Sequence, residues 1–176
     1  MSLVRNMWHS YEIRHGNVQL RPLQEEDIEY LRQWRNNKAD SKYLSSIRYI
    51  TTEAQRAWFQ ECMESDENIT FGIIDLDRNV FVGSIALYNF DVDQAELGRL
   101  MIGDPEAHGR HLGRNAVEGL SDLAFSKLRV NKLILHVYKD NIPAVTIYKQ
   151  AGYIIVDEYQ ASDGKIEVLM ERSCRS

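Results

Sequence analysis

The pattern of apolar and polar residues changes twice before residue 50. Alternation from Asn17 to Pro22 predicts a short strand. From Gln24 to Asn36 the apolar residues recur three positions apart, which predicts a helix whose apolar face carries Ile28, Leu31 and Trp34. The polar stretch from Asn37 to Ile50 indicates a loop or a broken helix. A second helix should then begin at Thr52, which forms a capping-box pattern with Gln55, and should end near Glu64. Its expected apolar stripe is Ala54, Trp58 and Cys62.

The middle of the chain has the pattern of strands followed by a long helix. The runs Ile69 to Leu76 and Val80 to Asn89 flank turn-forming residues and predict a hairpin, which Ala95 to Ile102 extends to a meander. After Pro105 the pattern is helical to about Lys127. The apolar face of this helix comprises Leu112, Ala116, Leu120, Leu123 and Ala124.

The last third predicts one more strand, a short helix and a closing hairpin. Lys132 to Tyr138 is almost continuously apolar, so we expect a central strand covered on both faces. Asn141 and Pro143 suit the cap and first turn of a helix that ends before Gly152. The expected hairpin strands are Tyr153 to Tyr159 and Lys165 to Glu171.

Composition narrows the class of protein. The 176 residues, 44% of them hydrophobic, suffice for one domain, expected at 17–176 after an N-terminal extension at 1–16. A net charge of -5 argues against nucleic-acid binding. Cys62 and Cys174 have neither disulfide-framework nor metal-site spacing, and we find no signal peptide or long apolar run. We therefore expect a cytoplasmic protein that binds neither nucleic acid nor membrane.

The segment from Glu96 to Val117 combines a strand, a glycine-containing turn and a helix start. Backbone N–H groups at a helix start lack partners and, with the helix dipole, favour an anion such as a pyrophosphate. Gly109 and Gly113 allow close backbone approach, and Arg110 and Arg114 could add charged hydrogen bonds. The residues expected to bind this anion are His108, Gly109, Arg110, His111, Leu112, Gly113 and Arg114.

A second block, Tyr138 to Tyr153, combines a strand end, an Asn-capped helix and a Gly-aromatic pair. Asn141 and Tyr148 are about two helical turns apart and project toward the same side. With the order of elements from Asn17 to Glu171, these two blocks resemble the GNAT superfamily of acetyltransferases. The resemblance implies an α/β fold with a mixed, mostly antiparallel twisted sheet flanked by helices, with splayed central strands. It also implies acetyl-CoA as cosubstrate, without a metal, and an N-acetyltransferase activity on a small-molecule amine.

The resemblance also implies roles for single residues. Aligned to the superfamily's Q/R-x-x-G-x-G/A loop, His108 takes the first position and His111 the middle glycine, two departures from the pattern. Tyr148 would protonate the departing thiolate, and Asn141 would contact the cofactor. Glu96 is either the base for the amine or an exposed strand residue. The backbone groups expected to pair with pantetheine and polarise the thioester belong to Leu100, Met101 and Ile102.

The acceptor is less well defined by the sequence. Trp34, Arg35 and Asn36 resemble the W-R-N of acetyltransferases that act on nucleotide-linked amino sugars, where an indole can stack and a guanidinium can bind phosphate. These residues could equally just complete a helix. A polyamine or a ribosomal-protein N-terminus is the alternative acceptor, and an inactive acyl-CoA-binding module is the alternative of another class. His108 and His111 lack a third ligand for a metal, and a homodimer is left open.

Overall fold

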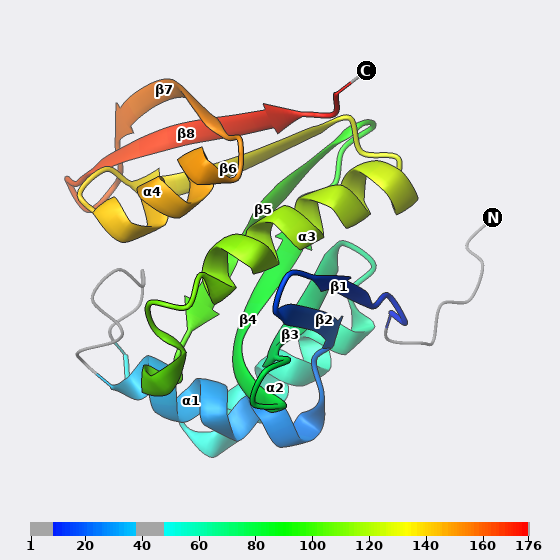
Figure 1. The fold of residues 1–176 in the computed structure, drawn as a ribbon. Coiled ribbons are helices and arrows are strands. Elements are labelled where there is room, and N and C mark those ends of the chain that lie inside the picture. Colours follow the sequence, from blue (N-terminus) through cyan, green and yellow to red (C-terminus); the bar gives the residue numbers. More distant parts are fainter. Residues whose placement is uncertain (1–8, 38–47, 176) are drawn as a thin grey trace.

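The structure is a computed structural model and describes residues 9–37 and 48–175. Its described residues form one eight-stranded sheet with the order β1-β2-β3-β4-β5-β6-β8-β7 (Figure 1). All neighbouring strands are antiparallel except β5 and β6, which run parallel. The strands are β1 Ile13–His15, β2 Val18–Pro22, β3 Asn68–Asp75, β4 Val80–Tyr88, β5 Gln94–Ile102, β6 Lys132–Tyr138, β7 Ile154–Gln160 and β8 Ile166–Ser173. This is the mixed, mostly antiparallel α/β sheet that the resemblance implied.

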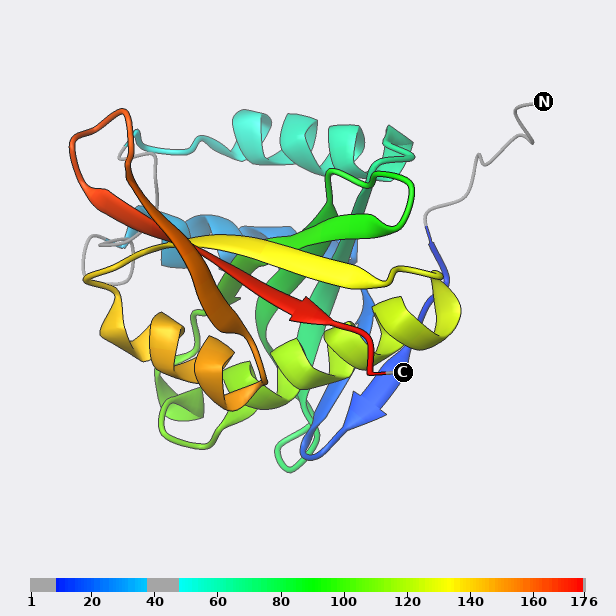
Figure 2. The ribbon, with the colours of Figure 1, turned by 90° about the horizontal axis from the view of Figure 1, so that it is seen from above.

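Helices cover both faces of the sheet. Figure 2 shows α1 and α2 on one face, and α3 and α4 on the other. The helices are α1 Ile28–Asn36, α2 Thr52–Glu64, α3 Leu112–Lys127 and α4 Ile142–Gln150, with short 3-10 turns at Glu25–Asp27 and Pro105–Ala107. No helix in the described ranges has the length and apolar character needed to span a bilayer.

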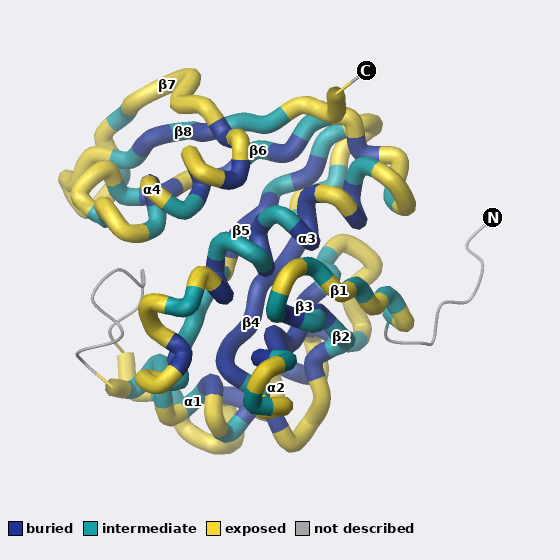
Figure 3. The backbone as a smooth tube through the Cα atoms, in the orientation of Figure 1, coloured by how far each residue is buried: buried dark blue, intermediate teal, exposed yellow. Residues whose placement is uncertain are grey.

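Two apolar clusters hold these layers together. The larger one joins the sheet to α3 and α4, and the whole predicted apolar face of α3 is buried in it. The smaller one joins α1 and α2 to the sheet through Leu23, Ile28, Leu31 and Phe59. Figure 3 shows the buried positions concentrated along β4 and the inner side of α3, whereas β7 is exposed.

The two central parallel strands pair over a short distance only. Their register joins Gln94–Glu96 of β5 to residues 132–134 of β6, and the strands diverge beyond these positions. On its other side, β5 shifts register against β4 between Ser84 and Ala86, and Arg99 has a positive φ of 53°. The expected splay of the central strands is confirmed, and it leaves part of the β5 backbone without a strand partner on the β6 side.

The start of α2 differs from the sequence prediction by one residue. The cap is Thr51, whose hydroxyl accepts a hydrogen bond from the Ala54 backbone N–H, because Thr51 has extended backbone angles and Thr52 is already helical. The buried face is therefore rotated: Gln55, Phe59 and Cys62 are buried, whereas Ala54 is exposed. The predicted stripe of Ala54, Trp58 and Cys62 was wrong for its first member.

Two further differences concern the edges and centre of the sheet. Residues 13–15, expected in an N-terminal extension, form β1 and pair with β2. Strand β6 is interior, but its burial alternates, with Leu135 buried and His136 exposed, so it is not covered on both faces. The reason is the splay, which opens one face of β6 to a cavity. Most of the expected loop at 37–50 lies outside the described residues.

Candidate active site

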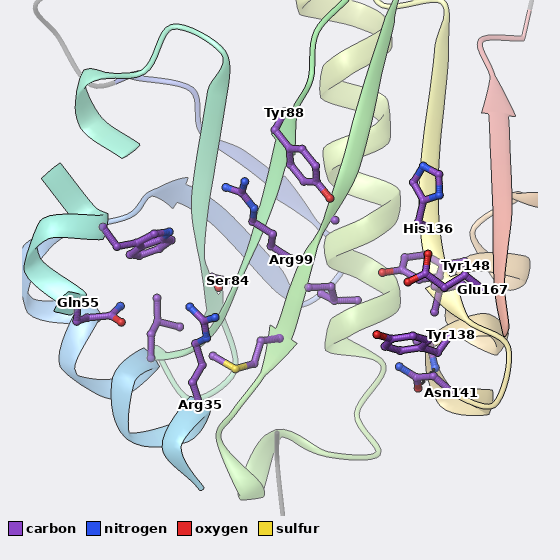
Figure 4. A pocket seen from close by; sticks show the side chains of 17 residues that line it. Arg35, Gln55, Ser84, Tyr88, Arg99, His136, Tyr138, Asn141, Tyr148 and Glu167 are labelled. Atoms are coloured by element: carbon purple, nitrogen blue, oxygen red, sulfur yellow. Dashed lines mark hydrogen bonds between the residues drawn. The ribbon is translucent and has the colours of Figure 1, made fainter. Parts of the chain in front are cut away.

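A cavity of about 490 Å³ lies where β5 and β6 diverge (Figure 4). One wall comes from α1 and α2 with Arg35 and Gln55, and the opposite wall from β6, α4 and β8 with Asn141, Tyr148 and Glu167. The full lining is Leu31, Arg35, Gln55, Trp58, Ser84, Tyr88, Gly98, Arg99, Leu100, Met101, His136, Val137, Tyr138, Asn141, Ala144, Tyr148 and Glu167.

Tyr148 and Asn141 are brought together in this cavity as the sequence predicted. Asn141 caps α4, because its side-chain oxygen accepts from the Ala144 backbone N–H at 3.3 Å. Tyr148 is only 6% exposed, and burial, with Tyr153 and Tyr88 nearby, raises the pKa of its hydroxyl. Among the described residues this hydroxyl makes no hydrogen bond, whereas that of Tyr153 is bonded to Ser121. Tyr148 therefore presents a neutral phenol to the cavity.

The β5 side of the cavity contains two of the three backbone positions expected to meet a ligand. Leu100 and Met101 line the cavity, and Ile102 does not. Gly98 lies directly against the Tyr88 hydroxyl, so a side chain at this position would collide with it. The absence of a side chain at Gly98 keeps the β5 backbone accessible from the cavity.

Glu96 lies beside the cavity and does not line it. Its two carboxylate oxygens accept hydrogen bonds from the Tyr88 hydroxyl at 3.0 Å and from the Asn89 amide at 2.9 Å. Tyr88 does line the cavity, and its burial, followed by the charge of Glu96, raises the pKa of its hydroxyl. Glu96 thus reaches the cavity through Tyr88, and its role as a base stays a prediction.

A hydrogen-bonded chain that sequence analysis missed crosses β6, β7 and β8. His136 Nδ1 lies 2.6 Å from the Tyr159 hydroxyl, which donates to Glu167 Oε2 at 2.5 Å. His136 and Glu167 line the cavity. The signal in the sequence was His136 itself, the polar residue in the apolar run of β6. Its partners could not be found there, because they lie on strands that meet only in the folded sheet.

Helices α1 and α2 and strand β5 carry hydrogen-bond donors in the cavity for which the described residues supply no acceptor. Burial, and then the charge of Arg99, lowers the pKa of Arg35. Arg99 stacks on the Tyr88 ring at 4.4 Å, and within the described residues neither arginine forms an ion pair. Gln55 is 2% exposed, and its Nε2 has no hydrogen-bond partner there. Burying the Gln55 amide is unfavourable unless a ligand satisfies it, whereas Arg99 is exposed.

Trp34 and Asn36 do not line the cavity, although they flank Arg35. Trp34 stacks on Phe81 with ring centroids 5.6 Å apart and packs against the bare backbone of Gly103. Asn36 bonds both the N–H and the carbonyl of Ile50. Of the three residues predicted to bind the acceptor, the structure brings only Arg35 to the cavity.

The N-terminus of α3 has the open form expected of an anion site. His111 is the cap residue and has a left-handed backbone conformation. Its side chain accepts no hydrogen bond from the first backbone N–H groups of the helix. Gly109 has a positive φ of 75°, and a Cβ there would meet nothing within 4 Å. Gly113 differs from the expectation, since a Cβ there would point inward and lie 3.3 Å from Ile147. Leu112 is buried in the core.

The basic side chains of this loop already have protein partners. Arg110 pairs with Asp75 and Asp77, and Arg114 pairs with Glu118 at 2.8 Å. His108 lies 3.3 Å from the Ile102 carbonyl. The open groups of the loop are therefore backbone N–H groups. Throughout the described ranges, no three His, Cys, Asp or Glu side chains are grouped as a metal site.

Comparison with known sequences identifies relatives over most of the chain. Residues 17–154 match the model of the acetyltransferase (GNAT) domain family. Acetyltransferase PseH from Campylobacter jejuni is 26% identical over 136 residues, which are 77% of this chain and 82% of that protein. Spermidine N(1)-acetyltransferase from Escherichia coli is 27% identical over 155 residues, or 81% of this chain and 75% of that one.

Comparison with solved structures gives the same fold. A GNAT-family acetyltransferase from Bacillus anthracis has a TM-score of 0.80 at 15% identity and covers 93% of this chain and 98% of its own. Spermidine N-acetyltransferase from Vibrio cholerae, solved in complex with CoA and spermine, has a TM-score of 0.79 at 20% identity, with 89% and 95% covered.

Proposed function

Because the chain belongs to the acetyltransferase (GNAT) family, we propose that it transfers an acetyl group from acetyl-CoA to a primary amine of a nucleotide-linked amino sugar. The observation that carries the choice of acceptor is a set of cavity-lining donors that have no partner among the described residues: Arg35 of α1, Gln55 of α2 and Arg99 of β5.

The residues present fit acetyl-CoA, which supplies its acetyl group as an activated thioester. The uncapped N-terminus of α3, with open space at Gly109, suits a pyrophosphate held by backbone N–H groups. The β5 backbone from Leu100 to Ile102, without a strand partner on the β6 side, suits the amide-bearing pantetheine arm. Asn141, beside Tyr148 in the cavity wall, would contact the same arm.

Tyr148 acts on the leaving sulfur. Its raised pKa keeps the phenol protonated at neutral pH, so the hydroxyl donates a hydrogen bond to negative charge that develops on that sulfur. Because no described side chain competes for this hydrogen, the group needs no rearrangement before it acts. This favours an active enzyme over an inactive acyl-CoA-binding module.

The donors of Arg35, Gln55 and Arg99 select the acceptor. Two guanidinium groups and an amide N–H can be satisfied by phosphate, carboxylate or sugar oxygens. A protonated polyamine offers only further donors and positive charge, which Arg35 and Arg99 repel. A nucleotide-linked sugar therefore complements the wall better. We assign no part in this recognition to the indole of Trp34, which packs on Phe81.

The place of the reaction and the oligomeric state are also part of the proposal. We place the enzyme in the reducing cytoplasm, since Cys62 and Cys174 are both free thiols. A homodimer stays a prediction.

The test is an acceptor screen with acetyl-CoA, read by release of free CoA thiol. The panel contains UDP-linked amino sugars, the corresponding free amino sugars, spermidine and a short ribosomal-type peptide. We expect the nucleotide-linked sugars to have the highest kcat/KM and the free sugars a raised KM. Faster acetylation of spermidine or the peptide would overturn the acceptor assignment. If none of the amines is acetylated, the proposed acetyltransferase activity itself is wrong.

A further inference from the structure

We propose that His136 is the catalytic base that removes the proton from the acceptor amine, with Tyr159 and Glu167 as the residues that position it. This inference rests on the proposed function. It replaces Glu96, the carboxylate that the resemblance suggested, by a residue that lines the cavity.

The hydrogen bonds determine which imidazole nitrogen is free. Tyr159 has one hydroxyl hydrogen, and it is donated to the Glu167 carboxylate, which as an anion can only accept. The Tyr159 oxygen can then only accept from His136 Nδ1, so Nδ1 carries the hydrogen of the neutral ring. Nε2 is left with a lone pair. A base needs this form, because the proton must arrive at an unprotonated nitrogen.

The strand register places this chain in the cavity. Glu167 of β8 is opposite Tyr138 of β6 on one side and Tyr159 of β7 on the other. His136 is two residues before Tyr138, on the same face of β6. Among the described residues, further ionisable groups near this chain are Tyr88 of β4, Glu96 and Arg99 of β5, Tyr138 of β6, Tyr148 of α4 and Asp157 of β7. Glu167 is the carboxylate that stabilises positive charge on the imidazole through Tyr159.

Glu96 is less suited to the same task. Both of its oxygens accept hydrogen bonds from Tyr88 and Asn89, and the side chain does not line the cavity. Its register partner on β6 is Ile134, two residues before His136. Glu96 therefore orients Tyr88, whereas His136 lines the cavity itself.

The step is a proton transfer. The acceptor enters as R–NH₃⁺, its N–H bond breaks, and the proton forms a bond with His136 Nε2. The products are R–NH₂, with a free lone pair for acyl transfer, and an imidazolium hydrogen-bonded to Tyr159. Because His136 is exposed, the imidazolium then loses its proton to water.

The first experiment tests the tautomer without any substrate. The chain has five histidines, so the ¹⁵N signals of His136 are assigned as those missing from His136→Gln. We expect the neutral ring to carry its hydrogen on Nδ1 in the wild type, and Tyr159→Phe to shift the population toward Nε2–H, the usual form in water. A wild-type ring with Nε2–H would overturn the proposal, whatever the acceptor is.

The second experiment tests the catalytic role with acetyl-CoA and a UDP-linked amino sugar. We expect His136→Gln to lower kcat about 100-fold at pH 7, the lower edge of general-base effects, with a small change in the KM for acetyl-CoA. The loss should shrink above the pKa of the acceptor amine, where the neutral amine needs no base. Tyr159→Phe and Glu167→Gln should show smaller losses with the same pH dependence.

Two variants serve as comparisons. His15→Asn changes a histidine that pairs with Glu118 outside the cavity, and its activity should match the wild type. Glu96→Gln should retain most of the activity if His136 is the base. A large, pH-dependent loss in Glu96→Gln with little loss in His136→Gln would return the role to Glu96. A wild type that acetylates no amine would refute the proposed function and leave the tautomer result standing.

Discussion

Two groups of arginines in this molecule have opposite surroundings. At the end of β3, the fully buried carboxylate of Asp75 accepts from Arg78 and Arg110, and Arg78 also reaches Asp104. In the cavity, Arg35 and Arg99 face each other without a carboxylate partner among the described residues. We infer that the paired group stabilises the fold, whereas the unpaired group is kept for a ligand.

Removing the carboxylate at the centre of the paired group should have the largest effect. We expect Asp75→Asn to lower the free energy of unfolding by about 3 kcal/mol, the low end for breaking a buried ion pair, because Arg78 and Arg110 keep other partners. Urea unfolding measures this loss. Asp77→Asn, at an exposed carboxylate, is the matched control and should cost much less. Equal losses would show that burial of Asp75 is unimportant.

The pairing of Asp75 with Arg78 and Arg110 makes the free energy of unfolding depend on pH. Burial alone would raise the pKa of Asp75, but hydrogen bonds from Arg78 and Arg110 outweigh it and lower the pKa to about 2. Since an unfolded Asp titrates at about 3.9, this contribution is complete above that pH and is lost as the pH falls toward 2. Urea unfolding measured from pH 5 to pH 2 should show that the difference in the free energy of unfolding between wild type and Asp75→Asn decreases as the pH falls.

In the cavity, removing the hydroxyl of Tyr148 should lower catalytic activity and leave stability unchanged. Tyr148→Phe removes a hydroxyl without a described protein partner, so we expect kcat to fall about 100-fold while folding and acetyl-CoA affinity persist. Tyr153→Phe is the matched control. Its hydroxyl is bonded to Ser121, so it should lose stability and keep its turnover. Unchanged kcat in Tyr148→Phe would assign Tyr148 to packing.

Removing one arginine of the unpaired group should weaken acceptor binding and leave the other kinetic constants unchanged. We expect Arg35→Ala to raise the KM for a nucleotide-linked amino sugar about tenfold, as expected for one lost charged hydrogen bond, with the KM for acetyl-CoA unchanged. Steady-state kinetics with both substrates varied would measure it. Arg56→Ala, at an exposed arginine of α2 that does not line the cavity, controls for loss of net charge. An unaffected acceptor KM would contradict the proposed acceptor site.

The smallest expected effect is a gain in stability. Gln55→Leu replaces a buried amide whose Nε2 lacks a partner, so the free energy of unfolding should rise by about 1 kcal/mol while acceptor binding weakens. Ser121→Ala, which removes a buried hydroxyl bonded to Val117 and Tyr153, should instead lose stability. A stability loss in Gln55→Leu would mean that Gln55 has a structural role.

Local patterns sufficed for much of the fold. The end of α3 near Lys127, its buried face, the Asn141 cap and both hairpins were predicted, because each depends on periodicity or on residues close in the chain. The start of α3 was not, since the helical pattern was expected from just after Pro105 and the helix begins at Leu112. The motifs that nominated Tyr148 and the loop from His108 to Arg114 are contiguous too, and the roles of these residues stay predictions. The Thr51 cap shows the limit of such patterns: two adjacent threonines offer the same hydroxyl, and backbone angles decide between them.

Only the tertiary structure decided what surrounds each site residue. Trp34, Arg35 and Asn36 are consecutive, yet packing against Phe81 and bonds to Ile50 turn two of them away from the cavity. Arg110 precedes a helix start that suits an anion, but its guanidinium is paired with Asp75. His136, Tyr159 and Glu167 become neighbours because β6, β8 and β7 are adjacent in the sheet. Local sequence determines backbone geometry, whereas the partner of a side chain depends on segments far apart in the chain.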